Sequence, residues 1–311
     1  MHQNLLSWVF LLGFCLALAS PAQAQASAPG RIVLARVAGQ VTLTPKDTGI
    51  ATAAVANATI TAGTIVTTGK GGSVILVFSN GSTINLREDS VLDIETFLQD
   101  PFEAMDLKVA DMTAEPSAST TKLNLTRGEL VGNVKKLDTA KGSTFEVTTP
   151  VGAAGIRGTT FRIVFRPDPA NPNRMLFSVS TAEGLIDVQM QGGAEGAVPV
   201  ADGREVVVEV NVSVDPITGA ITVTTPPQIV TQDIPASTQQ IIMSATQEVL
   251  SAVPNMVVPQ ASSGSPPAET PPTGEGEGNP PEPTTLAIAK QIAEPPPPVA
   301  PPPATTPGAG L

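Results

Sequence analysis

The sequence predicts an all-β domain, followed by one helix and a proline-rich tail. Two observations support the β prediction. Short runs of Val, Ile, Thr and Leu alternate with Gly, Asn and Asp over residues 31–226. No segment of that region has a convincing helical period of apolar residues. The tail is predicted from an abrupt change of composition, because Pro, Gly and Glu dominate from residue 259 onward.

The first 24 residues have the features of a signal peptide. Residues 5–18 form a mostly apolar run of about 14 residues, too short to span a bilayer as a helix. Small residues follow at Ala22 and Ala24, where a signal peptidase would cut, although the segment contains no Lys or Arg. We therefore expect a signal peptide at 1–24 and an exported protein, either periplasmic or extracellular.

Fourteen candidate strands follow from the apolar and β-branched runs. They are 32–37, 40–44, 64–67, 74–78, 83–86, 91–94, 122–126, 129–134, 144–148, 161–165, 176–181, 185–190, 204–214 and 220–224. Residues 99–120 are a polar connection, predicted as a surface excursion, and 166–174 are predicted as a loop rich in Pro and Asn.

One hairpin is indicated with particular clarity. Asn80-Gly81 joins two strands and predicts a tight two-residue turn with positive φ at both positions. The strand before it, 74–78, is continuously apolar, which predicts burial on both faces. The strand after it alternates, so Ile84 and Leu86 should face the core while Asn85 and Arg87 face outward.

A single helix is predicted at 238–253. Ser237 and Gln240 have the spacing of a capping box. An apolar stripe at helical spacing follows, formed by Ile241, Ile242, Ala245, Val249, Leu250 and Val253. The stripe is expected to pack on the β domain, with docking to a partner as the alternative. The tail at 259–311 is predicted to be disordered, with an extended polyproline character.

The glycine-rich segment 149–163 raises the question of a phosphate loop. No lysine follows its last glycine, and a strand follows where a phosphate loop would need a helix. We therefore interpret Gly155 and Gly158 as a tight corner between strands. Arg157 lies between them, and its side chain is expected to pair with a carboxylate or with nearby carbonyls, with a functional role as the alternative.

Several function classes are excluded by what the chain lacks. The only His, Cys and Trp lie within residues 1–24, and the sequence contains no Tyr. Without imidazole or thiol, the expected mature chain cannot use a histidine base or a cysteine nucleophile, and almost no structural zinc site is available. The net charge of −11 disfavours nucleic acid. We predict no enzyme activity, no cofactor and no metal site.

Two motifs could still suggest an enzyme. Ser119 and Lys122 match the S-x-x-K pattern, but they lie in a loop leading into a strand, and the companion motifs are missing. Asp93 and Glu95 are expected on one face of a strand, which would suit a hydrolase based on carboxylates. The absence of Trp and Tyr after residue 24 removes the usual platform for a sugar ring.

Three phrases in order resemble the FecR domain family. They are "ARVAGQVTLTP", "AGTIVTTGKGGSVILVFSNGSTINLREDSVLDI" and "LNLTRGELVGNV" with "FEVTTPVGAAGIRGTTFRI". The resemblance covers about residues 31–165, and its signature and turn positions in this chain are Asn80, Gly81, Gly155, Arg157, Gly158, Thr159 and Phe161. It implies a twisted β domain that is either β-solenoid-like or two-layered.

The expected organisation is therefore a signal peptide at 1–24, a FecR-like β domain at 31–165 and a β extension packed on it at 166–226. A linker with the helix at 227–258 and the tail at 259–311 complete it.

The resemblance also shapes the functional hypotheses. Transmembrane regulators of the family sense an outer-membrane receptor and signal to an anti-sigma segment, but this sequence shows neither a cytoplasmic helical segment nor a later spanning run. The leading hypothesis is an exported, non-enzymatic β module that binds a protein or a cell-envelope component. The alternative is a periplasmic component of a FecR-type signalling or iron-uptake system, and a hydrolase is the least favoured. No integral membrane segment is expected after signal cleavage, and exposed sheet edges leave self-association open.

Overall fold

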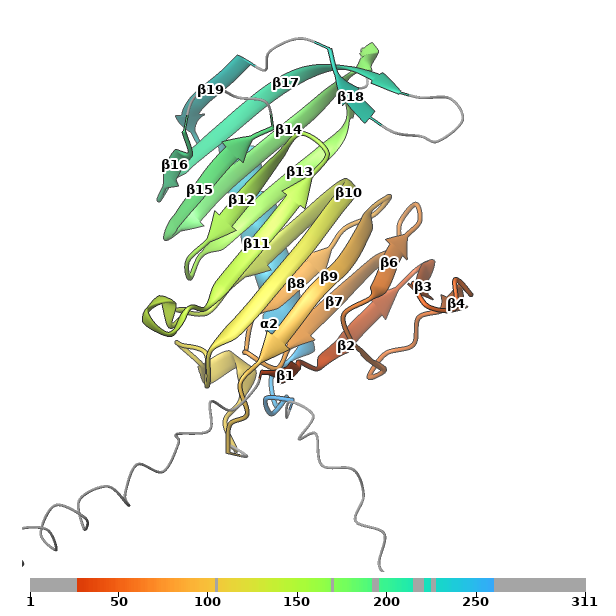
Figure 1. The fold of residues 1–311 in the computed structure, drawn as a ribbon, viewed down its shortest axis with the longest axis vertical. Helices are drawn as coiled ribbons and strands as arrows, with labels where there is room; N and C mark the ends of the chain where they lie inside the picture. Colours follow the sequence, from red (N-terminus) through yellow and green to blue (C-terminus); the bar gives the residue numbers. More distant parts are fainter. Residues whose placement is uncertain are drawn as a thin grey trace, which may run out of the picture. The chain divides into compact units, whose positions relative to one another are not determined.

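The computed structural model describes residues 27–103, 106–168, 171–191, 196–214, 221–224 and 228–259. All of them lie in the first of two compact units, Met1–Ser265. In the described residues this unit is a two-layer β fold with the helix α2 behind it (Figure 1), as the sequence predicts. The expected signal peptide and the proline-rich tail beyond residue 259 lie outside the described residues.

Strand pairing defines two open sheets. In spatial order, sheet A contains β4 (Thr52–Ala53), β3 (Val41–Pro45), β6 (Thr64–Thr68), β9 (Val91–Gln99), the first part of β10 (Ser119–Asn133), β11 (Thr144–Thr149), β12 (Gly152–Ile156), β15 (Leu185–Met190) and β16 (Val198–Ala201). Sheet B contains β5 (Thr59–Ile60), β2 (Ile32–Ala38), β7 (Ser73–Phe78), β8 (Thr83–Leu86), the last part of β10, β13 (Thr160–Asp168), β14 (Asn171–Glu183), β17 (Arg204–Val214) and β19 (Gln228–Asp233). The short strands β1 (Ala28–Pro29) and β18 (Ile221–Val223) pair with β9 and β17.

Strand β10 belongs to both sheets. Residues 119–127 pair with β9 in sheet A, and residues 128–133 pair with β13 in sheet B. The strand changes sheet at Gly128, which has φ 108° and lies against Ser90. The sequence predicts two separate strands here, at 122–126 and 129–134, and this prediction is wrong because the bend keeps the backbone paired throughout.

The hydrophobic core lies between the two sheets. Strands of each sheet send alternate side chains into it, as expected for packed β layers. Phe78 of sheet B meets two rings of sheet A edge to face, with centroids 5.1 Å from Phe97 and 6.2 Å from Phe145. Such geometry adds about 0.5 to 1.5 kcal/mol per pair beyond burial.

The β7–β8 hairpin follows the sequence prediction in most respects. Strand β7 is buried on both faces, since Leu76 packs between the sheets while Val77 contacts a second cluster on the outer face. The turn itself differs, because only Gly81 has a positive φ (83°) and Asn80 does not. Phe78 and Ser82 pair across a three-residue loop, which needs one left-handed position, whereas the predicted two-residue type I′ turn needs two.

The helix α2 (Ala236–Ala252) covers the outer face of sheet B, confirming that it packs on the β domain (Figure 1). Ile242, Ala245 and Val249 are buried as the apolar stripe predicts, but Leu250 is 46% exposed. The predicted capping box is wrong: the helix begins at Ala236, and its N-cap is Pro235, two residues before Ser237, so Ser237 lies inside the first turn.

Two predicted loops contain regular structure. The 99–120 connection includes a 3-10 turn, η1 (Val109–Asp111), whose Val109 packs in the cluster on the outer face of sheet B. A second 3-10 turn, η2 (Thr139–Lys141), connects β10 to β11. The predicted loop at 166–174 is largely the hairpin of β13 and β14, so the expected boundary between 165 and 166 falls inside β13.

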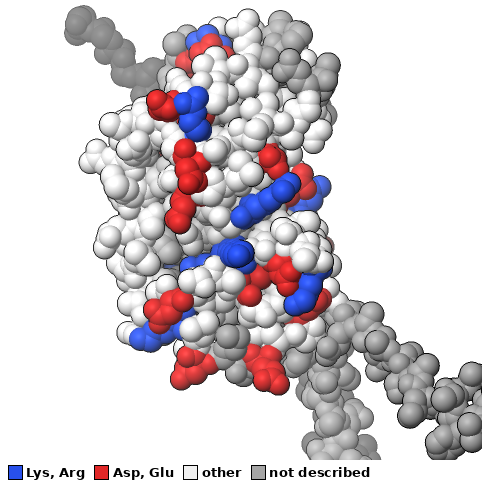
Figure 2. Space-filling view, turned by 90° about the vertical axis from the view of Figure 1, so that its left-hand side faces the viewer, with Lys and Arg blue, Asp and Glu red and all other residues white. Residues whose placement is uncertain are grey.

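Among the described residues, no helix is both long and apolar enough to cross a membrane. The surface is weakly charged: on the face shown in Figure 2, most side chains are uncharged, and Lys and Arg lie close to Asp and Glu. This distribution is consistent with a sequence in which 14% of residues are charged.

Candidate functional site

A row of polar side chains crosses the outer face of sheet B. Strand register aligns six residues on neighbouring strands: the polar Asn85, Arg162, Ser180, Glu205 and Gln232, and the apolar Val131 between Asn85 and Arg162. Alternation explains this placement: in β13, Phe161 and Ile163 enter the core, so Arg162 between them faces outward. Polar residues on a buried outer face must find partners, and most of this row does.

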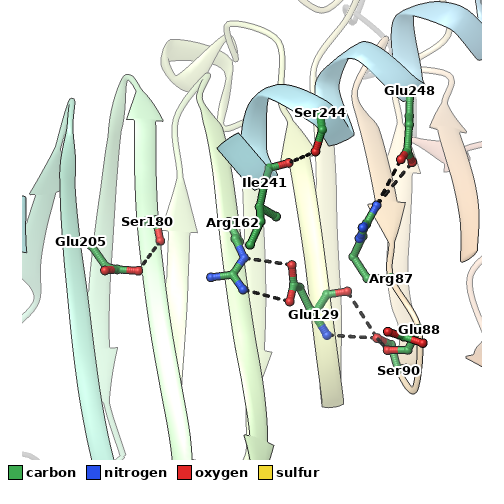
Figure 3. Close-up of polar contacts among 10 residues, drawn as sticks. All are labelled: Arg87, Glu88, Ser90, Glu129, Arg162, Ser180, Glu205, Ile241, Ser244 and Glu248. Carbon is green, nitrogen blue, oxygen red and sulfur yellow. Dashed lines mark hydrogen bonds and ion pairs between the residues drawn. The ribbon is translucent and has the colours of Figure 1, made fainter. Parts of the chain in front are cut away.

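Arg162 forms a two-bonded ion pair with Glu129 (Figure 3). Its Nε and one terminal nitrogen each donate to a carboxylate oxygen at 2.9 Å, and the Arg162 side chain is only 8% exposed. Ser90 holds the backbone of Glu129, since its hydroxyl accepts from the Glu129 amide at 3.0 Å. Because breaking a buried pair leaves an uncompensated charge, this arrangement fixes both side chains.

Farther along the row, Glu205 is buried, and its carboxylate accepts hydrogen bonds from two neighbouring side chains. The Ser180 hydroxyl donates to it at 2.8 Å (Figure 3), and the Gln232 amide donates to its other oxygen at 3.1 Å. Both carboxylate oxygens therefore have a donor, which is what a buried carboxylate requires.

Helix α2 is held over this row by polar contacts at its side. Arg87 forms an ion pair with Glu248 at 3.3 Å (Figure 3), and the Asn85 amide donates to the same carboxylate at 3.0 Å. Asn85 and Arg87 face outward from β8 as the sequence predicts, but the helix covers Asn85 completely.

A groove of about 560 Å³ runs beside the helix, and four arginines line it. Arg36 comes from β2, Arg87 follows β8, Arg127 lies in β10 and Arg166 lies in β13. Strand register shifts occur directly before Arg36 and Arg127, so local irregularities of β2 and β10 aim both side chains here. We call this the arginine groove.

The free groups of the arginine groove are mainly cationic. Within the described residues, the side chains of Arg36, Arg127 and Arg166 are exposed and have no ion-pair or hydrogen-bond partner. The acidic lining residues are largely satisfied: Glu129 pairs with Arg162, Glu248 with Arg87, and Glu88 accepts from the Gly71 amide at 2.7 Å. Asp89 is the remaining acidic lining residue.

A smaller, mostly apolar pocket of about 140 Å³ lies at the other side of the helix. Val131, Ala245, Val249 and Val253 line it together with Lys135. Burial lowers the pKa of the Lys135 ammonium below its usual range, because the charged form loses hydration there.

The comparisons with known proteins identify the central part of this fold. The family model described as "FecR protein" matches residues 64–187. The chain carries a FecR domain. The resemblance seen in the sequence is thus confirmed, although the matched segment begins and ends later than the expected 31–165.

Two crystal structures of a candidate anti-sigma factor from Parabacteroides distasonis ATCC 8503 also match. Each is 16% identical over 58% of this chain, with a TM-score of 0.37. The chain spans less than two thirds of that protein, 64% in one structure and 63% in the other. No curated protein matches the chain.

The first two predicted signature residues of the FecR domain form a buried turn. Asn80 is fully buried; its amide donates to the Ser119 hydroxyl at 3.1 Å, and its oxygen accepts from the Ser82 amide at 3.0 Å. A Cβ on Gly81 would lie 2.6 Å from the Met112 sulfur, so a side chain there would require Met112 to shift and would also be strained by the φ of 83°.

The other signature residues surround the β12–β13 connection of the FecR domain. Gly158 lies in this turn with φ 80°, Thr159 is buried, and Phe161 lies in the core. Arg157 is 62% exposed and pairs with Asp187 at 2.8 Å. Gly155 is not at a corner, which corrects the sequence interpretation, because it pairs with Glu146 and Asp187 within β12.

The two enzyme-like motifs are not assembled as reactive centres. Asp93 pairs with Lys46 at 2.5 Å, and Glu95 pairs with Lys122 at 3.1 Å. The Glu95 carboxylate raises the pKa of Lys122 through a hydrogen bond and its charge. Ser119 is buried and donates to Glu115 at 2.6 Å, away from Lys122. In the part of the chain that the structure describes, no acidic, His or Cys cluster could hold a metal ion.

Sequence reasoning missed both the arginine groove and the polar row. The groove arginines are far apart in the sequence, and Arg36 lies outside the matched FecR segment while the other three lie within it. The only available signal was alternation within β13, which marks Arg162 and Arg166 as outward-facing residues of a buried strand.

Proposed function

We propose that this chain is a non-enzymatic binding module of a FecR-type regulatory system and that it acts by binding a protein partner. The FecR domain at residues 64–187 carries this proposal. An exported, periplasmic location belongs to the proposal and rests on the signal peptide expected at 1–24.

The outer face of sheet B is the proposed recognition surface. Its centre is fixed by the Arg162–Glu129 pair, helix α2 packs across it, and a polar and an apolar hollow flank the helix. Rigid support with free polar groups at the rim is the arrangement expected of a protein-binding surface. Binding a protein requires no reactive group, in keeping with a chain that has no His or Cys after residue 24.

The proposal is tested in the cells that produce the protein. Cells lacking the chain should show altered levels of a defined set of transcripts, and re-expression should restore them. Covalent cross-linking from the outer face of sheet B, for example at Glu88→Cys, should capture one protein at near-stoichiometric yield. Unchanged transcripts together with capture of a cell-wall polymer would instead favour an envelope-binding module.

A further inference from the structure

The arginine groove is a surface with unmatched positive charge in an acidic protein. The chain has a net charge of −11, yet three guanidinium groups at one groove have no partner within the described residues. Exposed arginines in such a chain would ordinarily find carboxylates nearby, as Arg157, Arg174 and Arg204 do. Of the groove acids, Glu129 and Glu248 are paired with arginines, and the three free guanidinium groups outnumber the two remaining carboxylates, Glu88 and Asp89.

Guanidinium groups spread along a groove suit carboxylates. Each planar guanidinium can donate two parallel hydrogen bonds to one carboxylate, and separated arginines can bind successive acidic side chains of an extended segment. Pro167 and Ile241 add apolar contact to the lining. Nucleic acid suits this surface less well, because the net negative charge repels it and the sequence offers no Tyr, and no Trp after residue 24, for base stacking.

We infer that the arginine groove binds an acidic peptide segment of the partner protein. Arg36, Arg127 and Arg166 supply the free charges, and Arg87 remains paired with Glu248 as the fixed wall beneath α2. This inference rests on the proposed protein-binding function, which it makes more specific by naming the chemistry of the partner.

Fluorescence anisotropy tests the inference with the protein purified from the cells that produce it. The probe is a labelled peptide of alternating Glu and Ser, and the same peptide with Gln in place of Glu is the uncharged control. We expect saturable binding of the acidic peptide only. The variant Arg36→Gln, Arg127→Gln, Arg166→Gln should weaken it about tenfold or more, and added salt should weaken it in the wild type.

A matched control separates the groove from the overall charge. The variant Arg31→Gln, Lys136→Gln, Arg157→Gln removes three charges from exposed positions outside the groove lining. It should bind the acidic peptide within about twofold of the wild type. Equal losses in both variants, or stronger binding of a thymidine oligonucleotide of the same charge, would overturn the inference. All six positions are exposed, so unchanged melting temperatures confirm that the variants fold.

The two proposals can fail separately. If the groove variant still captures the cellular partner while losing the acidic peptide, the groove assignment fails and the binding function stands. If neither variant nor wild type captures a partner, the proposed function fails whatever the peptide shows.

Discussion

Among the glycines of the described chain, Gly128 is the one whose added Cβ would come nearest to another atom. Its φ of 108° is unfavourable for a residue with a side chain, and a Cβ there would lie 2.1 Å from the Ser90 hydroxyl oxygen. The same hydroxyl accepts from the Glu129 amide, so the close approach is what pins β10 where it changes sheet.

Replacing Gly128 with alanine should therefore destabilise the protein. Backbone strain and the steric clash together should lower the free energy of unfolding by about 2 to 4 kcal/mol. Gly155→Ala is the matched control, since its added Cβ would meet only the Asp187 carbonyl oxygen, at 3.8 Å. Urea denaturation of both variants measures the difference, and equal stabilities would contradict the role given to Gly128.

Because Lys135 is partly buried, we expect the stability of the protein to depend on pH in the alkaline range. Burial lowers its pKa in the folded protein, so the unfolded chain binds more protons as the pH approaches the ordinary lysine value. Stability should then rise with pH between the lowered pKa and about 10.5. Lys135→Met should raise stability below that window and remove this part of the slope. Unfolding measured against pH in both proteins checks it, and parallel curves would refute the buried-amine explanation.

At the scale of elements, helix α2 is attached through few contacts. Only Thr238, Ile242, Ala245 and Val249 of its 17 residues are buried. Its other contacts with sheet B are the Glu248 interaction with Asn85 and Arg87, the Asn85 bond to the Ala245 carbonyl, and the partly buried Ala252. A helix held this lightly should separate from sheet B before the sheets themselves open.

Placing a charge at Ala245 should release this helix. Ala245 is fully buried against Val131, whereas Met243 is 64% exposed on the same helix. Ala245→Glu should cost roughly 3 kcal/mol, limited by the energy of undocking. Met243→Glu should cost less than about 1 kcal/mol. Hydrogen exchange should speed up in 236–252 alone, and faster exchange across the inner strands as well would contradict independent release.

Strands were predicted correctly from the sequence where a run of apolar side chains marks them. They were missed where only backbone pairing with neighbouring strands defines them. Runs such as 74–78 are recognised as strands because they consist of apolar residues. Strand β12 is Gly-Ala-Ala-Gly-Ile, with little side-chain signal, and it exists because β11 and β15 pair with it on both sides. The arginine groove could not be predicted either, because its residues lie far apart in the sequence and come together only when β2, β10 and β13 assemble in the sheet.

At the scale of the whole molecule, the edge strands of the sheets determine where two copies of the chain could pair. Among the described strands, β4 and β5 are two-residue edges, and the edge strand β16 contains Pro199, which cannot donate to a neighbour. Strand β19 is six residues long and almost wholly exposed, with Val230 54% exposed. It is the least protected edge of the described fold.

We therefore expect any self-association to use β19. Val230→Lys should reduce it, because a lysine on an edge strand opposes pairing with another chain. Gln247→Lys adds the same charge on the exposed side of α2 and should leave association unchanged. Sedimentation velocity over a range of concentrations distinguishes them, and an equal effect of both variants would point to charge alone.

The position of α2 in the chain also matters for how the protein is made. Asn85 and its helix partner Glu248 are 163 residues apart. In a chain synthesised from its N-terminus, the outer face of β7 and β8, including Ile75 and Val77, therefore stays uncovered until almost the last described residue has emerged. A long-lived apolar strand face of this kind is prone to aggregation. The cell must keep the nascent chain apart from its neighbours until α2 arrives, and the yield of folded protein should depend on chaperone supply more than on final stability.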